Sequence, residues 1–317
     1  MKTIGPNGLI KDLNDNFAEV AYQHPVAPLF VDTFIASPGN GYGGWANALD
    51  TMEDALTAVE TGGTIYFRGD VREELIGSNL VFDVTIIGCG SKHHPDLPAA
   101  GYDGGAACWR PPASPTEATP LLEVRGRGWK FQNILFDCPV DAAALKFVRN
   151  ALSGVNEYDA SHASVIGCDF RNGKYGIQDD GGVWNMRIED NDFETIDATN
   201  GCAIINTSSS VAAPRRWVIL NNRFQMDSST EGNLQHLDSP LNGSTIMGNV
   251  FGTVKSTGIY VDLTGGAGNV VANNILGGVY DTSDYVAATG DLWYQNAVAV
   301  KVTTAPDGLS LDVPAAP

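Results

Sequence analysis

Five short stretches of the chain share one pattern of apolar and polar positions. Each begins with an aliphatic residue, carries Asn or Cys three positions later, and ends two positions after that on Phe or Leu. The closing residues stand at positions 170, 193, 224, 251 and 276, so consecutive copies are 23, 31, 27 and 25 residues apart. A looser copy covers residues 129–136. Because a self-similar step of roughly 20–50 residues is typical of repeat architectures, the pattern predicts a solenoid.

The residue types at the repeated positions indicate which solenoid this is. In a parallel β-helix the strands of successive coils lie about 4.8 Å apart, so equivalent side chains stack on one another. Buried Asn side chains can then hydrogen-bond to their copies, and rings can stack in the core. We expect Cys168 to occupy the Asn position one coil earlier. The predicted amide ladder comprises Asn191, Asn222, Asn249 and Asn274, and the predicted aromatic stack comprises Phe170, Phe193, Phe224 and Phe251.

The fold expected is all-β: a single-stranded right-handed parallel β-helix over residues 31–284, with an N-terminal capping helix and non-repeat terminal segments. An open solenoid end exposes core and backbone, so it must be covered. Residues 47–60 predict a helix that does this, with Asn47 as its cap and Gly62-Gly63 at its end. Its apolar stripe comprises Leu49, Met52, Leu56 and Val59.

Three further segments flank or interrupt the repeat. Residues 1–30 are either an anchoring arm or a second part of the end cover, since their apolar stripe at helical spacing fits both. Residues at about 91–120 are rich in Pro, Ala and Gly and predict a loop inserted between early coils. Residues 285–317 predict a β-hairpin about Asp307-Gly308, which would be a trimerisation or docking element or a lid.

The order of a capping helix, Gly62-Gly63 and the strand Thr64–Phe67 resembles the opening of the pectate-lyase-like superfamily. That superfamily includes phage tailspikes and other virion proteins, and the resemblance covers roughly residues 31–280. It implies a right-handed parallel β-helix and, for the virion branch, a homotrimer. Spacing alone does not indicate an oligomeric state.

Composition narrows the expected partners and location. The formal net charge of −18 and the isoelectric point of about 4.4 disfavour nucleic acid and anionic lipid. No secretory signal pattern opens the sequence and no run of about 18 apolar residues occurs, so we expect no membrane insertion and a virion made in a host cytoplasm. Five scattered cysteines predict small buried hydrophobes. No cofactor and no metal site are expected.

Two carboxylate motifs are candidates for catalysis. Asp179-Asp180 is similar to the paired-Asp motif of the polygalacturonase family, although the Gly-His-Gly and Arg-Ile-Lys companions of that family are absent. The alternative is a turn, where Asp is common. His236 and Asp238 could act as a base and its orienter, because strand alternation would place both on one face. The alternative there is a surface polar pair.

Other residues suggest ligand contacts. Trp184, Trp217 and Tyr260 are candidates for stacking on sugar rings, with a structural role as the alternative. Arg215-Arg216 either serves a lyase or neutralises neighbouring acids. The acidic stretch at 189–197 is either a Ca²⁺ site or a solvated edge.

The function hypothesis is a non-enzymatic bacteriophage virion surface protein: a capsid decoration protein, a head spike, or a receptor-binding, tailspike-like protein. Its partners would be other virion proteins, contacted through the terminal segments, and host surface polysaccharide. The alternative is a polysaccharide-degrading depolymerase, either a glycoside hydrolase or a lyase, for which acids from adjacent coils should converge. A third hypothesis is a bacterial adhesin module.

Overall fold

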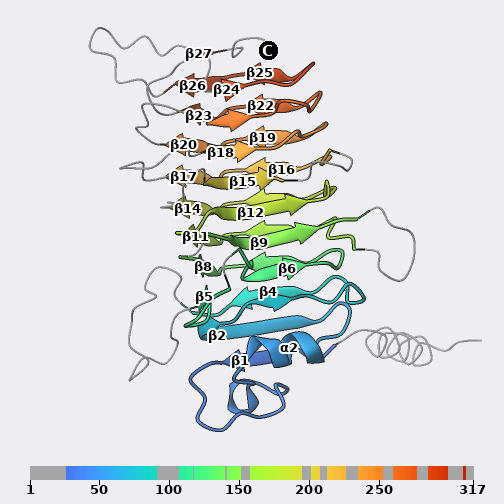
Figure 1. The fold of residues 1–317 in the computed structure, drawn as a ribbon, viewed down its shortest axis with the longest axis vertical. Helices are drawn as coiled ribbons and strands as arrows, with labels where there is room; N and C mark the ends of the chain where they lie inside the picture. The colour runs from blue at the N-terminus through green and yellow to red at the C-terminus, as the bar shows by residue number, and fades with distance from the viewer. Residues whose placement is uncertain are drawn as a thin grey trace, which may run out of the picture.

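Short strands recur in the same order along the chain and stack into one column of coils (Figure 1). Each coil contributes a strand to each of three parallel sheets, which we call faces A, B and C in chain order. The predicted right-handed parallel β-helix is confirmed. The computed structural model describes residues 26–90, 107–116, 118–139, 141–150, 158–194, 201–207, 213–225, 235–252, 260–276, 285–298 and 310–311.

Faces A and B are continuous through β2, the long strand Thr64–Arg72, whose two halves pair with different strands. Face A also contains β1 (Leu29–Asp32), β4 (Thr85–Gly88), β7 (Lys130–Gln132), β10 (Ser164–Ile166), β13 (Arg187–Glu189), β16 (Val218–Leu220), β19 (Thr245–Met247), β22 (Val270–Ala272) and β25 (Leu292–Tyr294). Face B continues through β5 (Ala107–Arg110), β8 (Leu135–Asp137), β11 (Asp169–Arg171), β14 (Asp192–Glu194), β17 (Arg223–Gln225), β20 (Val250–Gly252), β23 (Ile275–Leu276) and β26 (Asn296–Val298).

Face C is a separate sheet that runs along the same column. All of its strand pairs are parallel, as in the other two faces of the coils. It contains β3 (Leu75–Ile76), β6 (Leu122–Val124), β9 (Ala143–Val148), β12 (Tyr175–Asp180), β15 (Cys202–Asn206), β18 (Gln235–Asp238), β21 (Val261–Asp262) and β24 (Tyr285–Val286).

The aromatic stack lies in the core behind face B, because its phenylalanines are direct partners in the strand register. Between Phe170 and Phe251, each ring centroid lies 4.8 to 4.9 Å from that of the next phenylalanine in the stack. Phe136 extends the stack at 5.2 Å from Phe170, which confirms the looser early copy of the repeat. Side-chain spacing therefore equals the strand separation that the backbone ladder imposes.

The amide ladder runs beside this stack, at the turn between faces A and B. Each Asn donates from Nδ2 to Oδ1 of the Asn one coil later, at 2.9 Å from Asn191 and at 3.0 Å from Asn222, Asn249 and Asn274. The same oxygens accept a backbone N–H of the preceding coil. The sequence prediction is confirmed, and Asn296 is a further member.

Both ends of the ladder are satisfied. Cys168 takes the position before Asn191, and its backbone N–H donates to Asn191 Oδ1 at 2.9 Å. At the other end, Asn296 Nδ2 donates to the Val271 carbonyl. The residue just before each ladder position has a positive φ, for example 54° at Asn221 and 67° at Gly248, which lets two residues turn the chain and point the amide inward.

A second polar column, which the sequence analysis missed, lies at the turn from face C to face A. Ser244 Oγ accepts Trp217 N at 2.9 Å, Asn269 Oδ1 accepts Ser244 N at 3.0 Å, and Asp291 Oδ1 accepts Asn269 N at 2.8 Å. Because the residue type changes from coil to coil, no repeated letter marks this column in the sequence.

The N-terminal cap contains a shorter helix than predicted. Helix α2 spans Met52–Ala58, and Thr51 caps it by accepting Asp54 N at 3.2 Å. The Glu73 carboxylate also accepts the free N–H groups of the first turn. Asn47 lies instead in a short 3-10 helix, η1 (Trp45–Asn47). The predicted stripe still faces inward, since its members belong to the core or pack against it.

The predicted segment boundaries need two corrections. Residues 91–120 are not all loop, because Ala107–Arg110 forms β5 between β2 and β8. The coils also continue past residue 284 through β24, β25 and β26, and β27 (Ser310–Leu311) then pairs antiparallel with β26. Residues 1–25 and the Asp307-Gly308 turn lie outside the described residues. The last copy of the repeat was missed because Trp293 replaces its aliphatic residue and Val298 its closing Phe or Leu.

Four of the five cysteines are buried, as expected, but Cys89 is exposed. Burial raises the pKa of the Cys108 thiol to about 12 and that of Cys202 well above its ordinary value. The described part of the chain contains no helix that is long and apolar enough to cross a membrane.

Replacing the central amide of the ladder should destabilise the fold strongly. Asn222→Leu leaves the backbone and side-chain N–H groups of Asn191 without their shared acceptor, which costs about 2–6 kcal/mol. Asp180→Ala removes one surface ion pair and should cost about 0–1 kcal/mol. Urea unfolding followed by far-UV circular dichroism compares the two. Equal midpoints for both variants would contradict the ladder's role.

Candidate functional site

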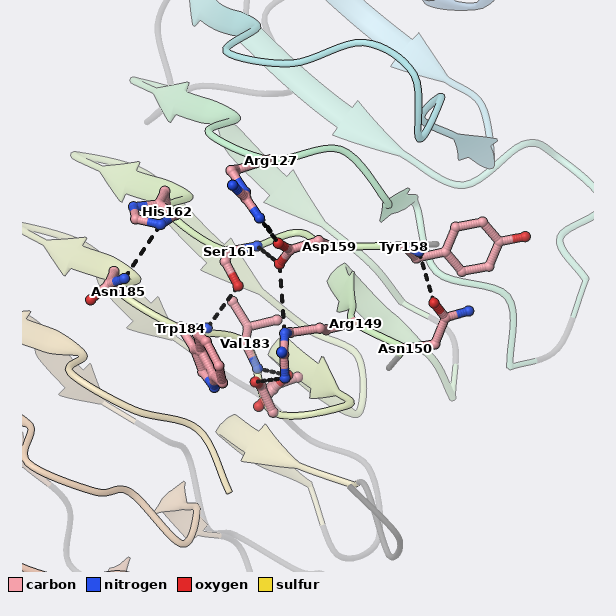
Figure 2. Close-up of polar contacts among 12 residues, drawn as sticks. Arg127, Arg149, Asn150, Tyr158, Asp159, Ser161, His162, Val183, Trp184 and Asn185 are labelled. Atoms are coloured by element: carbon pink, nitrogen blue, oxygen red, sulfur yellow. Dashed lines mark hydrogen bonds and ion pairs between the residues drawn. The ribbon is translucent and has the colours of Figure 1, made fainter. Parts of the chain in front are cut away.

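The corner at which face C turns into face A carries a cluster of charged side chains (Figure 2). Asp159 lies at the centre of this cluster, where its carboxylate accepts hydrogen bonds from the Arg127 guanidinium. Arg149 Nε lies 3.7 Å from Asp159 Oδ1. Burial raises the pKa of Asp159, but hydrogen bonds from Ser161 and Arg127 outweigh burial and hold that pKa below its ordinary value. The ionised carboxylate therefore fixes both guanidinium groups.

Trp184 packs against arginines at this corner. The guanidinium carbon of Arg149 lies 4.0 Å from the ring centroid and that of Arg215 lies 5.7 Å from it. Trp184 N donates to Ser161 Oγ at 3.0 Å, which ties the two coils together (Figure 2). The ring face against Arg149 is closed to a sugar, so the predicted stacking role does not fit there.

Arg215 and Arg216 are exposed on the next coil of the corner. Together with Trp184 and Asn185 they line a small pocket of about 110 Å³, which we call the Arg215–Arg216 pocket. Neither guanidinium has an ion pair with a residue that the structure describes, so the two interpretations of this basic pair stay open.

Asp179 and Asp180 do not form a catalytic pair. Consecutive strand residues point to opposite sides of a sheet. Asp179 is fully buried, and its two oxygens accept Val183 N at 3.0 Å and Asn206 Nδ2 at 2.6 Å. Asp180 faces outward, where Lys146 Nζ lies 2.9 Å from its carboxylate. The prediction of a shared role is wrong for this reason.

His236 and Asp238 also lie on opposite sides of their sheet. His236 is only 2% exposed, and its ring stacks in the core against Phe224 and Phe251 at 5.6 and 5.8 Å. The predicted alternation fails because His236 N and Leu237 N both donate to the Tyr260 carbonyl. Two residues thus oppose one, as in a β-bulge, and the side-chain alternation shifts by one position.

Asp238 instead faces Asp262, which the sequence analysis did not single out. The two are register partners on β18 and β21, and both are half-buried on the outer side of face C. Burial, and next the charge of Asp262, raise the pKa of Asp238 to about 6. Thr264 N donates to Asp262 Oδ1 at 2.8 Å and orients that carboxylate. The shared pattern of an aliphatic residue followed by Asp, at Leu237-Asp238 and Val261-Asp262, could have revealed the pair.

Two predicted sugar-stacking residues are core residues. Trp217 is fully buried, and its indole N–H donates to the Val183 carbonyl at 2.7 Å. Tyr260 is 3% exposed and stacks on Tyr285 with 5.5 Å between the centroids. Neither ring can contact a ligand outside the solenoid.

Glu189, Asp192 and Glu194 of the 189–197 stretch each lie beside an arginine. Glu189 pairs with Arg187, and Glu194 lies 3.4 Å from Arg171. Asp197 lies outside the described residues. Among the residues that are described, no three acidic, His or Cys side chains come together as metal ligands would.

Comparison with protein-family models gave no match, and neither did comparison with curated proteins. Solved structures do match. A GH136 lacto-N-biosidase from Eubacterium ramulus has a TM-score of 0.47 at 8% identity, over 92% of this chain and 66% of that one. A PL6 family alginate lyase has a TM-score of 0.41 at 15% identity, over 86% and 38%. A pectin methylesterase from carrot has a TM-score of 0.43 at 13% identity, over 90% and 86%.

With TM-scores below 0.5 and identities of 8 to 15%, these likenesses carry no argument about what this chain does. This chain spans only part of the length of the lacto-N-biosidase and of the alginate lyase. The predicted virion role stays a prediction.

The buried Asp179 should make stability depend on pH. Burial raises its folded-state pKa to about 6, from an ordinary value of 3.8. The folded chain therefore binds the Asp179 proton more tightly than the unfolded chain does. The stability that this proton contributes is fully present below about pH 4 and is lost as the pH rises through 6. Relative to wild type, Asp179→Asn should gain on the order of 2–3 kcal/mol in unfolding free energy between pH 4 and 7.

Urea titrations at several pH values measure this difference. Asp180→Asn is the matched control, because its carboxylate lies on the surface and its curve should parallel that of the wild type. Parallel curves for wild type and Asp179→Asn would show that Asp179 is not the buried titrating group.

Proposed function

We propose that the chain binds and cleaves a polysaccharide along the outer side of face C, with Asp238 and Asp262 as its two carboxyl groups. The observation that carries the proposal is their direct register on adjacent coils. Strands of adjacent coils lie about 4.8 Å apart. That spacing is near the roughly 5–5.5 Å that separates the two carboxyl groups of glycosidases that retain anomeric configuration.

The two carboxyl groups differ in the way that such chemistry requires. Asp238 keeps its proton to about pH 6, so it can protonate the leaving glycosidic oxygen as a general acid. Asp262, oriented by Thr264 N, would attack the anomeric carbon and form a glycosyl ester. In the second step Asp238 would take a proton from a water molecule, and that water would attack the anomeric carbon and cleave the glycosyl ester. Asp238 is then protonated again and Asp262 is free.

The outer side of face C offers further polar groups in line with this pair. Gln178 precedes Asp238 by two coils in the same register column, with Ile205 between them. Lys146 stands one coil before Gln178. A sugar chain lying along the solenoid axis would meet these side chains in succession, which favours a polymeric substrate over a single sugar.

Removing either carboxyl group should abolish cleavage. We expect Asp238→Asn and Asp262→Asn each to lower the release of reducing ends from a panel of bacterial surface polysaccharides by at least about 100-fold. Asp180→Asn is the matched control, since it changes an outward-facing acid on the same face, and should keep activity within about twofold.

The pH profile provides a second readout. Because Asp238 must be protonated to act, the wild-type rate should fall as the pH rises above about 6. Undiminished cleavage by both Asn variants, or no cleavage of any polysaccharide by the wild type, would refute the proposed hydrolase.

A second candidate is the non-enzymatic virion surface protein, assembled as a homotrimer. It is favoured by the apolar outer surface of the C-terminal coils, where Ile275, Leu292 and Tyr294 are 44%, 61% and 40% exposed. In the register of face A, the position of Leu292 is occupied by Arg187 four coils earlier, and that of Tyr294 by Glu189. Exposed apolar surface of this kind marks a protein contact, and a trimer would cover it.

The mass in solution tests this second candidate. Light scattering should give three times the chain mass of 33.6 kDa for the wild type, and Leu292→Glu should reduce it to one chain by placing a charge in the interface. Leu80→Glu is the control, because Leu80 is 73% exposed near the opposite end. A monomeric wild type would contradict the homotrimer.

A further inference from the structure

Three exposed apolar side chains stand close together at the corner that follows β3. Ile76, Leu80 and Phe82 are 59%, 73% and 42% exposed, and all three fall within residues 76–82. We call them the corner patch. Neither of the two proposed functions uses this patch. Because apolar side chains that gather on a surface mark a contact, the corner patch requires an occupant.

The segment that carries the corner patch is fixed to the next coil. Gly77 N and Asp83 N each donate to a backbone carbonyl of that coil at 2.8 Å. Between them, the Val81 carbonyl accepts the indole N–H of Trp129 at 2.9 Å. Because hydrogen bonds hold both ends and the middle of residues 77–83, the corner patch is a fixed surface on which another element can pack.

The described part of the chain begins beside this patch. Val26, its first residue, lies against Gly63, since a Cβ at Gly63 would be only 3.3 Å from Val26 Cγ1. The preceding residue, Gly62, donates its backbone N–H to the Phe82 carbonyl at 2.8 Å. The 25 residues that precede Val26 are therefore attached to the solenoid close to Phe82.

Those residues carry an apolar side of their own. Their apolar residues recur at helical spacing, and their acidic residues fall on the other side of such a helix. The apolar stripe comprises Ile10, Leu13, Phe17 and Val20, and the acids are Asp12, Asp15 and Glu19. A helix over residues 9–21 would be about 20 Å long. Isolated helices of this length are marginal in water, so the stripe needs a surface to pack on.

Reach and area favour a contact within one chain. The residues between 21 and 26 span up to about 17 Å when extended, which brings the stripe to Phe82. Phe34, another exposed apolar residue, lies beside Gly69 in the second half of β2 and is further from Val26 along that strand. Three side chains are far short of the roughly 800 Å² that each partner buries in a stable complex. A tethered segment needs less area, because its effective concentration is in the millimolar range.

We propose that residues 9–21 form a helix whose apolar stripe packs on the corner patch of the same chain. The acidic side of this helix faces solvent. Of the two roles that the sequence leaves open for residues 1–30, the contact assigns this segment to the cover of the solenoid, and its partner is its own chain. The inference depends neither on the proposed hydrolase nor on the homotrimer.

Hydrogen exchange of the full chain, followed by mass spectrometry, tests the contact from both sides. In the wild type, residues 9–21 should exchange at least about tenfold more slowly than a free peptide of the same sequence. Leu80→Glu should remove this protection, although Leu80 lies outside the segment. Phe17→Asp should in turn speed exchange in residues 76–83 at least about tenfold, because it places a charge in the apolar contact.

Two further variants are matched controls. Ala18→Asp adds the same charge one position outside the apolar stripe. Phe34→Glu changes an exposed apolar side chain that lies away from the corner patch. Both should leave exchange in residues 9–21 and 76–83 at the wild-type rate. Far-UV circular dichroism checks that each variant is folded.

Each remaining outcome decides for or against the contact. A double variant, Phe17→Asp/Leu80→Glu, that exchanges no faster than either single variant supports it, because both changes then break one interaction. Unprotected residues 9–21 in the wild type would show that no docked helix forms. Protection that survives Leu80→Glu would place the helix elsewhere, and protection that is lost on dilution would assign the corner patch to a second copy.

Discussion

The stacking of equivalent residues at the strand separation is the constraint on which this structure depends. Backbone hydrogen bonds between parallel strands place every residue over its counterpart, and the buried amides of Asn191, Asn222, Asn249, Asn274 and Asn296 satisfy one another only in that register. A slip by one residue would bury unpaired amides and remove Phe224 from between Phe193 and Phe251. The coils therefore have one alignment, although their loops differ in length.

The same register accounts for the candidate site. Asp238 and Asp262 come from separate coils, yet strand pairing places them opposite each other. Burial, and next the charge of Asp262, raise the pKa of Asp238 to about 6.

Sequence reasoning succeeded where one residue type recurs and failed where coils substitute different types. The repeated Asn and Phe predicted both interior columns, whereas the Ser244, Asn269 and Asp291 column has no repeated letter. Simple alternation misplaced His236, because the bulge formed by His236 and Leu237 opposite Tyr260 shifts the strand by one position. Asp262 was within reach of the sequence, since Leu237-Asp238 and Val261-Asp262 each consist of an aliphatic residue followed by Asp, one coil apart. The ion pairs of the arginines could not be predicted from the sequence, because they depend on which side chains the turns bring together.

Carbon-13 NMR of the aspartate carboxyl groups, in wild type and in Asp262→Asn, measures the central electrostatic claim directly. The account predicts that Asp238 titrates near pH 6 in the wild type and at a lower pH once its register partner is neutral. An Asp238 that titrates near its ordinary value of 3.8 in both proteins would show that the two carboxyl groups do not share a site.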